Sequence, residues 1–202
     1  MANLFRNIID DFLSREGLIL THDQQLAMNE FYKYHRAKAR YSAYILRGAA
    51  GTGKTFTIRI ITQFLLSQGF QVALMAPTGR AAKVITRRTR RYASTIHRYI
   101  YSPAEHPSGK VQFALKKNKD QEKTYYIVDE ASMVGGQPLM NGGEGLLSDL
   151  LEFVYGEEGN RRLIMVGDPY QLPPVGSSIS PALDRKYLEE NFSLMIWQSI
   201  VC

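Results

Sequence analysis

The residues best suited to chemistry stand together in one short glycine-rich motif, which covers residues 48–55. The motif reads GAAGTGKT and matches the pattern G-x-x-x-x-G-K-[ST] in full. Glycines allow successive backbone N–H groups to point at phosphate oxygens, Lys54 can reach the β- and γ-phosphates, and the Thr55 hydroxyl can coordinate Mg²⁺. A glycine turn with a chance lysine is the structural alternative. The sequence predicts that a nucleotide is bound by Gly48, Ala49, Ala50, Gly51, Thr52, Gly53, Lys54 and Thr55.

Two carboxylates follow a second apolar run at 125–128. A buried parallel strand delivers such residues to its C-terminal end, where open α/β sheets bind their ligands. Asp129 can hold Mg²⁺ through a water molecule, and Glu130 can position or deprotonate an attacking water. A polar strand end is the ordinary alternative, but the presence of the 48–55 motif favours the catalytic interpretation. The carboxylate pair also argues against a small-molecule kinase, which should exclude water.

A third apolar run at 163–166 is followed by Asp168 and Gln171. An amide side chain donates and accepts at once, so Gln171 can contact a phosphate oxygen and a water together. Asp168 can fix the loop or assist the metal. A turn stiffened by the prolines at 173–174 explains the same residues, and the spacing alone leaves both interpretations open.

The elements that must position these residues alternate along the chain. Short apolar runs predict buried parallel strands at 43–47, 71–76, 125–128 and 163–166. Helices are predicted at 4–13, at 55–68, and after a Thr21–Gln24 capping box, with Leu26, Ala27, Phe31 and Tyr34 on one face. Residues 99–123 are predicted as a hairpin or an ordered surface excursion, and 135–145 as a glycine-rich loop. This order of elements predicts an α/β fold.

The charge of the chain is unevenly distributed. Residues 1–128 carry 21 basic and 8 acidic side chains, a net +13, whereas residues 129–202 carry 4 basic and 11 acidic, a net −7. The segment 80–98 alone holds seven basic residues and no acidic one. Such a patch indicates a polyanionic partner or a solvated helix face, and charge alone does not choose between them.

Composition excludes several classes of protein. A chain of 202 residues with 45% hydrophobic and 22% charged residues has the length and composition of one folded domain. No apolar run is long enough to span a membrane, and Asp10 and Asp11 fall where a signal peptide needs an uncharged core. Cys202 is the only cysteine, which argues against disulfides and favours a reducing, cytoplasmic compartment.

Five motifs in fixed order resemble the first RecA-like motor domain of superfamily-one DNA helicases, and are most similar to the RecD-like group that includes Dda. The motifs are GAAGTGKT at 48–55, APTGRAAK at 76–83, STIHRYI at 94–100, IVDEASMV at 127–134 and VGDPYQLPPVG at 166–176. The resemblance covers about residues 18–176. It implies a three-layer α/β P-loop NTPase fold, with a mostly parallel sheet and helices on both faces.

The resemblance also implies roles for single residues. Gln24 would be the adenine ligand of a Q motif, although it can instead cap its helix and Gln25 stands beside it. Lys54, Glu130 and Gln171 would be catalytic, with Thr55 and Asp129 as metal ligands. Gln171 would couple loss of the γ-phosphate to movement along DNA. The residues implied to contact a single strand are Pro77, Thr78, Arg80, Thr95 and His97.

These implied roles favour a nucleic-acid surface for the segment 80–98. Basic side chains would neutralise phosphates, and aromatic faces would stack on bases. Tyr92, Tyr99 and Tyr101 lie in or near the segment, and two of the three are expected in the core.

The implied activity is that of an ATP- and Mg²⁺-dependent DNA helicase that moves 5′ to 3′ on single-stranded DNA, in DNA repair or recombination. RNA stays open as a substrate, because backbone contacts discriminate weakly. A P-loop switch or clamp loader without unwinding activity is the alternative, and a DNA-binding module that no longer hydrolyses ATP is a third.

The implied domain organisation is an N-terminal helix at 1–17 followed by a RecA-like domain at 18–202. Only 26 residues follow Gly176, too few for the family's second RecA-like domain and its arginine finger. The expectation is therefore a fragment with weak or no activity of its own, which works with that second domain. The oligomeric state is left open.

Overall fold

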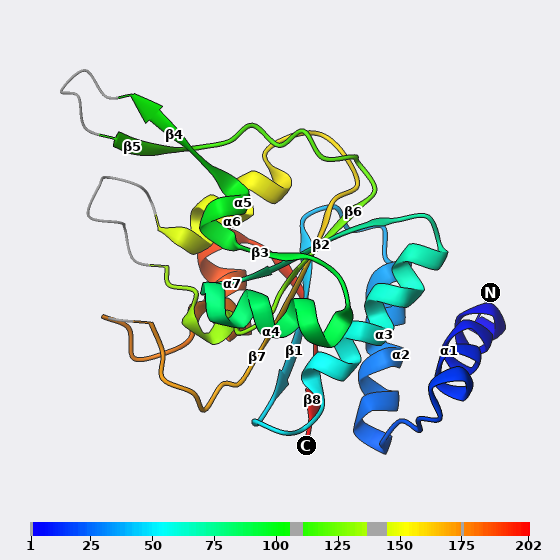
Figure 1. The fold of residues 1–202 in the computed structure, drawn as a ribbon. Coiled ribbons are helices and arrows are strands. Elements are labelled where there is room, and N and C mark those ends of the chain that lie inside the picture. Colours follow the sequence, from blue (N-terminus) through cyan, green and yellow to red (C-terminus); the bar gives the residue numbers. More distant parts are fainter. Residues whose placement is uncertain (1, 106–110, 137–144, 175) are drawn as a thin grey trace.

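Six parallel strands form the main sheet of the computed structural model, which describes residues 2–105, 111–136, 145–174 and 176–202 (Figure 1). The strand order is β3-β2-β6-β7-β1-β8, and every neighbouring pair is parallel. The strands are β1 (Ser42–Gly48), β2 (Gln71–Ala76), β3 (Ala93–Thr95), β6 (Thr124–Val128), β7 (Arg162–Gly167) and β8 (Met195–Val201). The four strands predicted from apolar runs are confirmed, whereas β3 and β8 were not predicted.

The helices lie on both faces of this sheet, with α1, α2 and α3 on one side and α5, α6 and α7 on the other (Figure 1). They are α1 (Ala2–Glu16), α2 (His22–Arg36), α3 (Lys54–Ser67), α4 (Gly79–Thr89), α5 (Ile96–Ile100), α6 (Leu146–Tyr155) and α7 (Arg185–Phe192), with short 3₁₀ turns η1 (Ala131–Met133) and η2 (Pro181–Leu183). None of the helices in the described ranges is long and apolar enough to cross a membrane.

Alternation along the strands builds two separate cores. In β1, Tyr44 and Leu46 pack with α1 to α4, while Ala43 and Ile45 pack with α5 to α7. Successive side chains of a strand point to opposite faces, so a strand with apolar residues throughout must be covered on both sides. The predicted three-layer α/β P-loop NTPase fold is therefore confirmed.

The start of α2 is set by the predicted capping box. The Thr21 hydroxyl accepts the backbone N–H of Gln24 at 3.3 Å, and the Gln24 side-chain oxygen accepts the Thr21 N–H at 3.1 Å. The predicted buried face is wrong at one position, since Leu26 is 50% exposed and Met28 is buried in its place. Helical spacing allows both positions near one face, and the packing of α2 on β1 and β8 decides between them.

The segment after α5 forms a two-stranded antiparallel hairpin, β4 (Tyr101–Glu105) and β5 (Val111–Leu115). Of the two interpretations of 99–123, the hairpin is therefore confirmed. The glycine-rich stretch 135–145 lies mostly outside the described residues, since 137–144 are not part of them.

The parallel arrangement has one consequence for function. Because all six strands run in one direction, their C-terminal ends meet at a single edge of the sheet. The glycine motif follows β1, Pro77 follows β2, Asp129 follows β6 and Asp168 follows β7. Segments that are distant in sequence are thus brought together along this edge.

Candidate functional site: a cleft at the carboxyl edge of the sheet

A cleft of about 530 Å³ lies at this edge. It is lined from the glycine motif by Ala50, Gly51, Gly53, Lys54 and Thr55, from the strand ends by Asp129, Glu130, Met133 and Gln171, and from α4 and its cap by Thr78, Arg80, Ala81, Val84 and Arg88. The structure therefore brings the predicted catalytic residues, both predicted metal ligands and two predicted strand-contacting residues to one cavity.

The glycine motif is shaped by left-handed backbone and close packing. Gly51 and Gly53 have φ angles of +88° and +85°, a conformation that favours glycine. At Gly48, a Cβ atom would lie 2.5 Å from the backbone oxygen of Val201, at the end of β8. Lys54 Nζ donates to the carbonyl oxygens of Gly48 and Ala49 at 2.8 Å each, which holds the ammonium group over the loop.

Gln24 lies beside the glycine motif and does not line the cleft. It is only 6% exposed, and its side-chain nitrogen donates to the backbone oxygen of Thr52 at 3.4 Å while its oxygen completes the capping box. A Cβ on Gly53 would meet the same side-chain nitrogen. The structure thus shows Gln24 supporting the loop, and the adenine contact implied by the resemblance stays a prediction. Gln25 instead donates to Leu20 on an exposed surface.

Asp129 is a buried carboxylate that faces the cleft. It is 6% exposed, and burial raises its pKa from 3.8 to about 6, while the nearby charges of Lys54 and Arg88 act in the opposite direction. Its Oδ1 accepts the backbone N–H of Glu130 at 3.0 Å, and Glu130 has a left-handed φ of +55°. Both neighbouring carboxylates line the cleft.

Gln171 is held by a residue that sequence reasoning missed. Ser132 Oγ donates to Gln171 Oε1 at 3.2 Å, and Ser132 is fully buried. A Cβ on Gly167 would lie 3.0 Å from the Ser132 backbone nitrogen, so the glycine lets η1 pack closely on β7. Asp168, 5% exposed, accepts the Tyr170 N–H at 2.9 Å and so fixes the loop. The motif 127–134 already contained Ser132, but its partner is 39 residues away.

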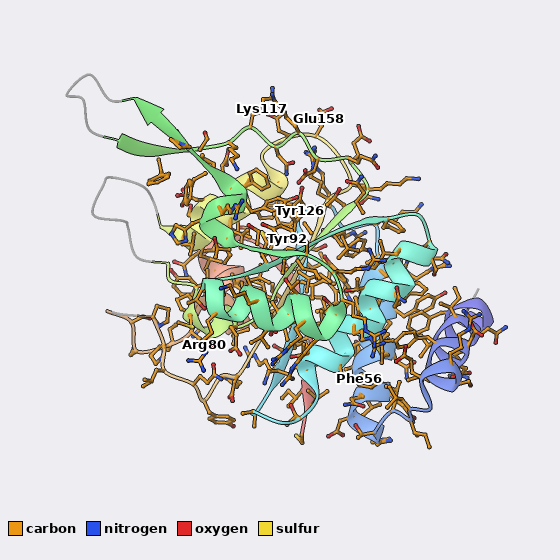
Figure 2. The ribbon with its side chains drawn as sticks, in the orientation of Figure 1. Phe56, Arg80, Tyr92, Lys117, Tyr126 and Glu158 are labelled. Atoms are coloured by element: carbon orange, nitrogen blue, oxygen red, sulfur yellow. The ribbon has the colours of Figure 1, made fainter. Side chains whose placement is uncertain are left out.

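Helix α4 contributes to the lining of the cleft, and Arg80 lies near the start of this helix (Figure 2). Thr78 caps this helix by accepting the Ala81 N–H at 3.2 Å. Arg80, in its first turn, and Arg88, two turns later, both line the cleft. Arg88 belongs to the segment 80–98 that is predicted as a nucleic-acid surface, but the structure places it in the lining of this cleft. Charge counting could not separate the faces of the helix, whereas the spacing of Arg80, Val84 and Arg88 could have done so.

Of the other predicted strand-contacting residues, Pro77 follows β2, whereas Thr95 and His97 lie at the end of β3. Thr95 caps α5 by accepting the Arg98 N–H at 3.2 Å, and His97 is exposed with its ring 5.6 Å from that of Tyr101. Neither residue lines the nucleotide cleft. The expectation that two of the three tyrosines pack in the core is confirmed, since Tyr101 is buried and Tyr99 packs against the core, while Tyr92 is 70% exposed.

Comparisons with known proteins agree with this architecture. A family model described as an AAA domain matches residues 35–177. The ATP-dependent RecD2 DNA helicase of Deinococcus radiodurans is 35% identical over 138 residues, which cover 67% of this chain and 16% of that protein. The ATP-dependent DNA helicase dda of phage T4 is 33% identical over 117 residues, 56% of this chain and 26% of that protein. The chain therefore spans only a minor part of these relatives.

Solved structures of low sequence identity share the fold. Bacteroides sp Pif1, crystallised with ADP-AlF4, superposes with a TM-score of 0.51 at 23% identity and covers 91% of this chain and 42% of its own. Pif1 helicase from Candida albicans also has a TM-score of 0.51, at 22% identity, and covers 91% of this chain and 40% of its own. The family match, these folds and the ordered motifs lead to one conclusion: the chain belongs to the AAA domain family, as a RecA-like domain of the superfamily-one helicase type within the RecD- and Dda-like group.

Proposed function

We propose that this chain is the ATP- and single-stranded-DNA-binding domain of an ATP-dependent DNA helicase. The observation that carries the proposal is the cleft itself, where the phosphate-binding motif, Asp129, Glu130 and Gln171 face an arginine-bearing wall. The names of the relatives support helicase activity, and the ADP-AlF4 bound to Bacteroides Pif1 supports the binding of a nucleotide. The second RecA-like domain, movement from 5′ to 3′ and a cytoplasmic compartment belong to the same proposal.

The nucleotide is held by its phosphates at the carboxyl edge of the sheet. Backbone N–H groups of the loop and the start of α3 attract anionic oxygens. Lys54 exchanges its two carbonyl contacts for contacts with the β- and γ-phosphates. Glu130 positions a water molecule and takes its proton as the water oxygen attacks the γ-phosphorus. The bond between the γ-phosphorus and the oxygen that bridges it to the β-phosphate breaks, which leaves ADP and phosphate. Gln171, oriented by Ser132, contacts the γ-phosphate and reports its loss.

The donor set of the cleft fits Mg²⁺. Thr55 and Asp129 offer hard oxygen atoms in the same cavity, and a cation there would offset the cost of a buried carboxylate. The described residues contain no cluster of three or more His, Cys, Asp or Glu side chains. Mg²⁺ keeps several waters and shares its remaining ligands with substrate phosphates. When bound, the ion neutralises developing charge on the phosphates.

A single strand would cross the sheet edge beside the nucleotide. Pro77 and Thr78 follow β2, Thr95 is the last residue of the adjacent strand β3, and His97 follows that strand. Arg80 lies in the first turn of α4 and lines the nucleotide cleft. Helix α4 therefore touches both proposed ligands, which provides a direct route by which nucleotide and strand affect each other's binding.

Replacing Lys54 tests the assignment of the phosphate site. Lys54→Ala is expected to weaken ATP binding by about tenfold to a hundredfold, since each hydrogen bond to a charged group contributes about 1.5–3 kcal/mol. Binding of adenosine, which has no phosphates, should be unchanged. Isothermal titration in Mg²⁺ measures both ligands, and Lys33→Ala, on an exposed face of α2, is the matched control. Unchanged ATP affinity in Lys54→Ala would show that the site assignment is wrong.

A further inference from the structure

A second cavity, of about 740 Å³, lies outside the nucleotide cleft, beside the base of the β4–β5 hairpin. Its rim carries four cationic side chains and one exposed aromatic ring, and we call this set the basic groove: Tyr92, Arg98, Lys116, Lys117 and Lys119. None of the five lines the nucleotide cleft. The groove is therefore separate from the nucleotide cleft, and its three lysines lie outside the five motifs of the helicase family.

The groove has a clear excess of positive charge. Asp120 is the acidic residue among its lining side chains, and its Oδ2 already accepts the hydroxyls of Tyr99 and Tyr126 at 2.8 Å each. Lys117 pairs with Glu157 at 3.4 Å, but both side chains are exposed, at 72% and 44%. Exposed pairs of this kind contribute little and exchange readily with another anion. The groove thus favours an anionic ligand.

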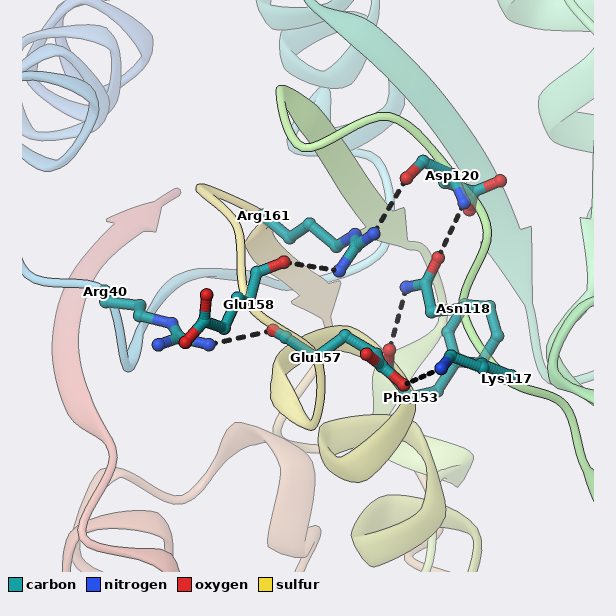
Figure 3. Close-up of polar contacts among 8 residues, drawn as sticks. All are labelled: Arg40, Lys117, Asn118, Asp120, Phe153, Glu157, Glu158 and Arg161. Atoms are coloured by element: carbon teal, nitrogen blue, oxygen red, sulfur yellow. Dashed lines mark hydrogen bonds and ion pairs between the residues drawn. The ribbon is translucent and has the colours of Figure 1, made fainter.

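The wall that presents the lysines is rigidly supported in the free protein (Figure 3). Asn118, 6% exposed, donates to the Phe153 carbonyl at 2.8 Å and accepts the Asp120 N–H at 2.9 Å. Arg161, also 6% exposed, donates to the Asp120 carbonyl at 2.8 Å. While Asn118 points inward, Lys117 and Lys119 on either side of it are exposed. A surface ordered in advance binds its ligand at a lower entropic cost.

The aromatic content of the groove favours a nucleic acid over an acidic peptide. Tyr92 is 70% exposed at the rim, and the Tyr99 and Phe153 rings meet edge to face at 5.9 Å on the inner side. An acidic peptide needs only the cations, whereas single strands use cations for the backbone and exposed rings for the bases. An exposed tyrosine beside four cations is the arrangement expected of a site that binds a single strand.

We infer that the basic groove binds a segment of single-stranded nucleic acid through its phosphates, with Tyr92 stacking on a base. The inference rests on the proposed function and extends the nucleic-acid surface from the segment 80–98 to Lys116, Lys117 and Lys119. Continuity along the chain supports it, because Arg98 of the groove directly follows His97, which is proposed to contact the strand. A strand that passes the end of β3 can therefore continue into the groove.

The test is strand affinity over a salt series, measured by fluorescence anisotropy with a labelled oligothymidine of about 16 nucleotides. Lys117→Gln/Lys119→Gln is expected to reduce the salt slope of log affinity by about 1.4, since each single-strand phosphate contact contributes about 0.7. Lys33→Gln/Lys186→Gln removes the same charge from α2 and α7 and should leave the slope unchanged. Tyr92→Ala should weaken binding about fivefold or more with little change of slope.

The outcomes separate the groove from the proposed function. A wild-type chain that binds no strand would overturn both. Strand binding by the wild type with equal slopes for the groove and control variants would overturn the groove alone. If the groove variants lost affinity for polyglutamate but not for oligothymidine, the groove would be a site for acidic peptides. That result would also overturn the inference. Thermal unfolding and ATP binding of the variants confirm that the fold and the separate cleft are intact.

Discussion

Glu130→Gln is expected to slow ATP hydrolysis by about 10²- to 10⁴-fold while ATP affinity is retained. The amide keeps the size of the side chain and can still orient a water, but it cannot accept the proton. Because Glu130 lines the cleft beside Lys54 without belonging to the phosphate loop, binding and hydrolysis should separate in this variant. Single-turnover hydrolysis of radiolabelled ATP measures the chemical step, and isothermal titration measures the affinity.

Glu158→Gln is the control for this experiment, since Glu158 is exposed on the loop between α6 and β7, away from the cleft. It should hydrolyse ATP at the wild-type rate. If Glu130→Gln hydrolysed ATP as fast as this control, another group would have to activate the water. If it lost ATP affinity as well, Glu130 would contribute to nucleotide binding rather than to the chemical step.

Asp129→Asn is expected to raise the free energy of unfolding of the ligand-free protein by about 3 kcal/mol at pH 7. Burial raises the pKa of Asp129 from 3.8 to about 6, so the folded state binds this proton more tightly than the unfolded state. The carboxylate therefore costs no stability below about pH 4, and its cost grows as the pH rises to 6 and stays constant above that. Asparagine keeps the oxygen that accepts the Glu130 N–H but carries no charge.

Urea unfolding of both proteins at pH 4 and pH 7 measures this effect. The difference should be near zero at pH 4 and largest above pH 6. Adding Mg²⁺ with ADP should stabilise the wild type more than Asp129→Asn. A variant that is less stable than the wild type at pH 7, or equally stabilised by Mg²⁺, would contradict the assigned role of Asp129.

The sequence predicted the fold well wherever a strand was apolar throughout. Such strands are buried on both faces, so four of the six are visible as continuous runs. Strand β8 was not predicted because it lies at the edge of the sheet and is not buried on both faces. Its exposed residues Met195 and Ile200 alternate with the buried residues Ile196 and Val201. It still matters to the site, since its last carbonyl limits Gly48 to a residue without a Cβ.

The candidate site was predicted in outline because parallel strands bring their C-terminal ends together. The chemistry of each motif could be inferred from its own residues. The parallel strand order then predicted that motifs far apart in the chain lie close together. Contacts between motifs could not be predicted in this way. The Ser132–Gln171 hydrogen bond, the position of Gln24 beside the loop and the direction of Arg88 depend on tertiary packing.

Nucleotide and single strand are proposed to bind side by side at one sheet edge and to affect each other's binding through α4. The most direct test measures oligothymidine affinity with and without a non-hydrolysable ATP analogue in Mg²⁺, and analogue affinity with and without the strand. Each ligand should change the affinity of the other by at least about fivefold, and by the same factor, as linkage requires. Two ligands that bind without any mutual effect would contradict the claim and would favour a nucleotide switch that does not act on DNA.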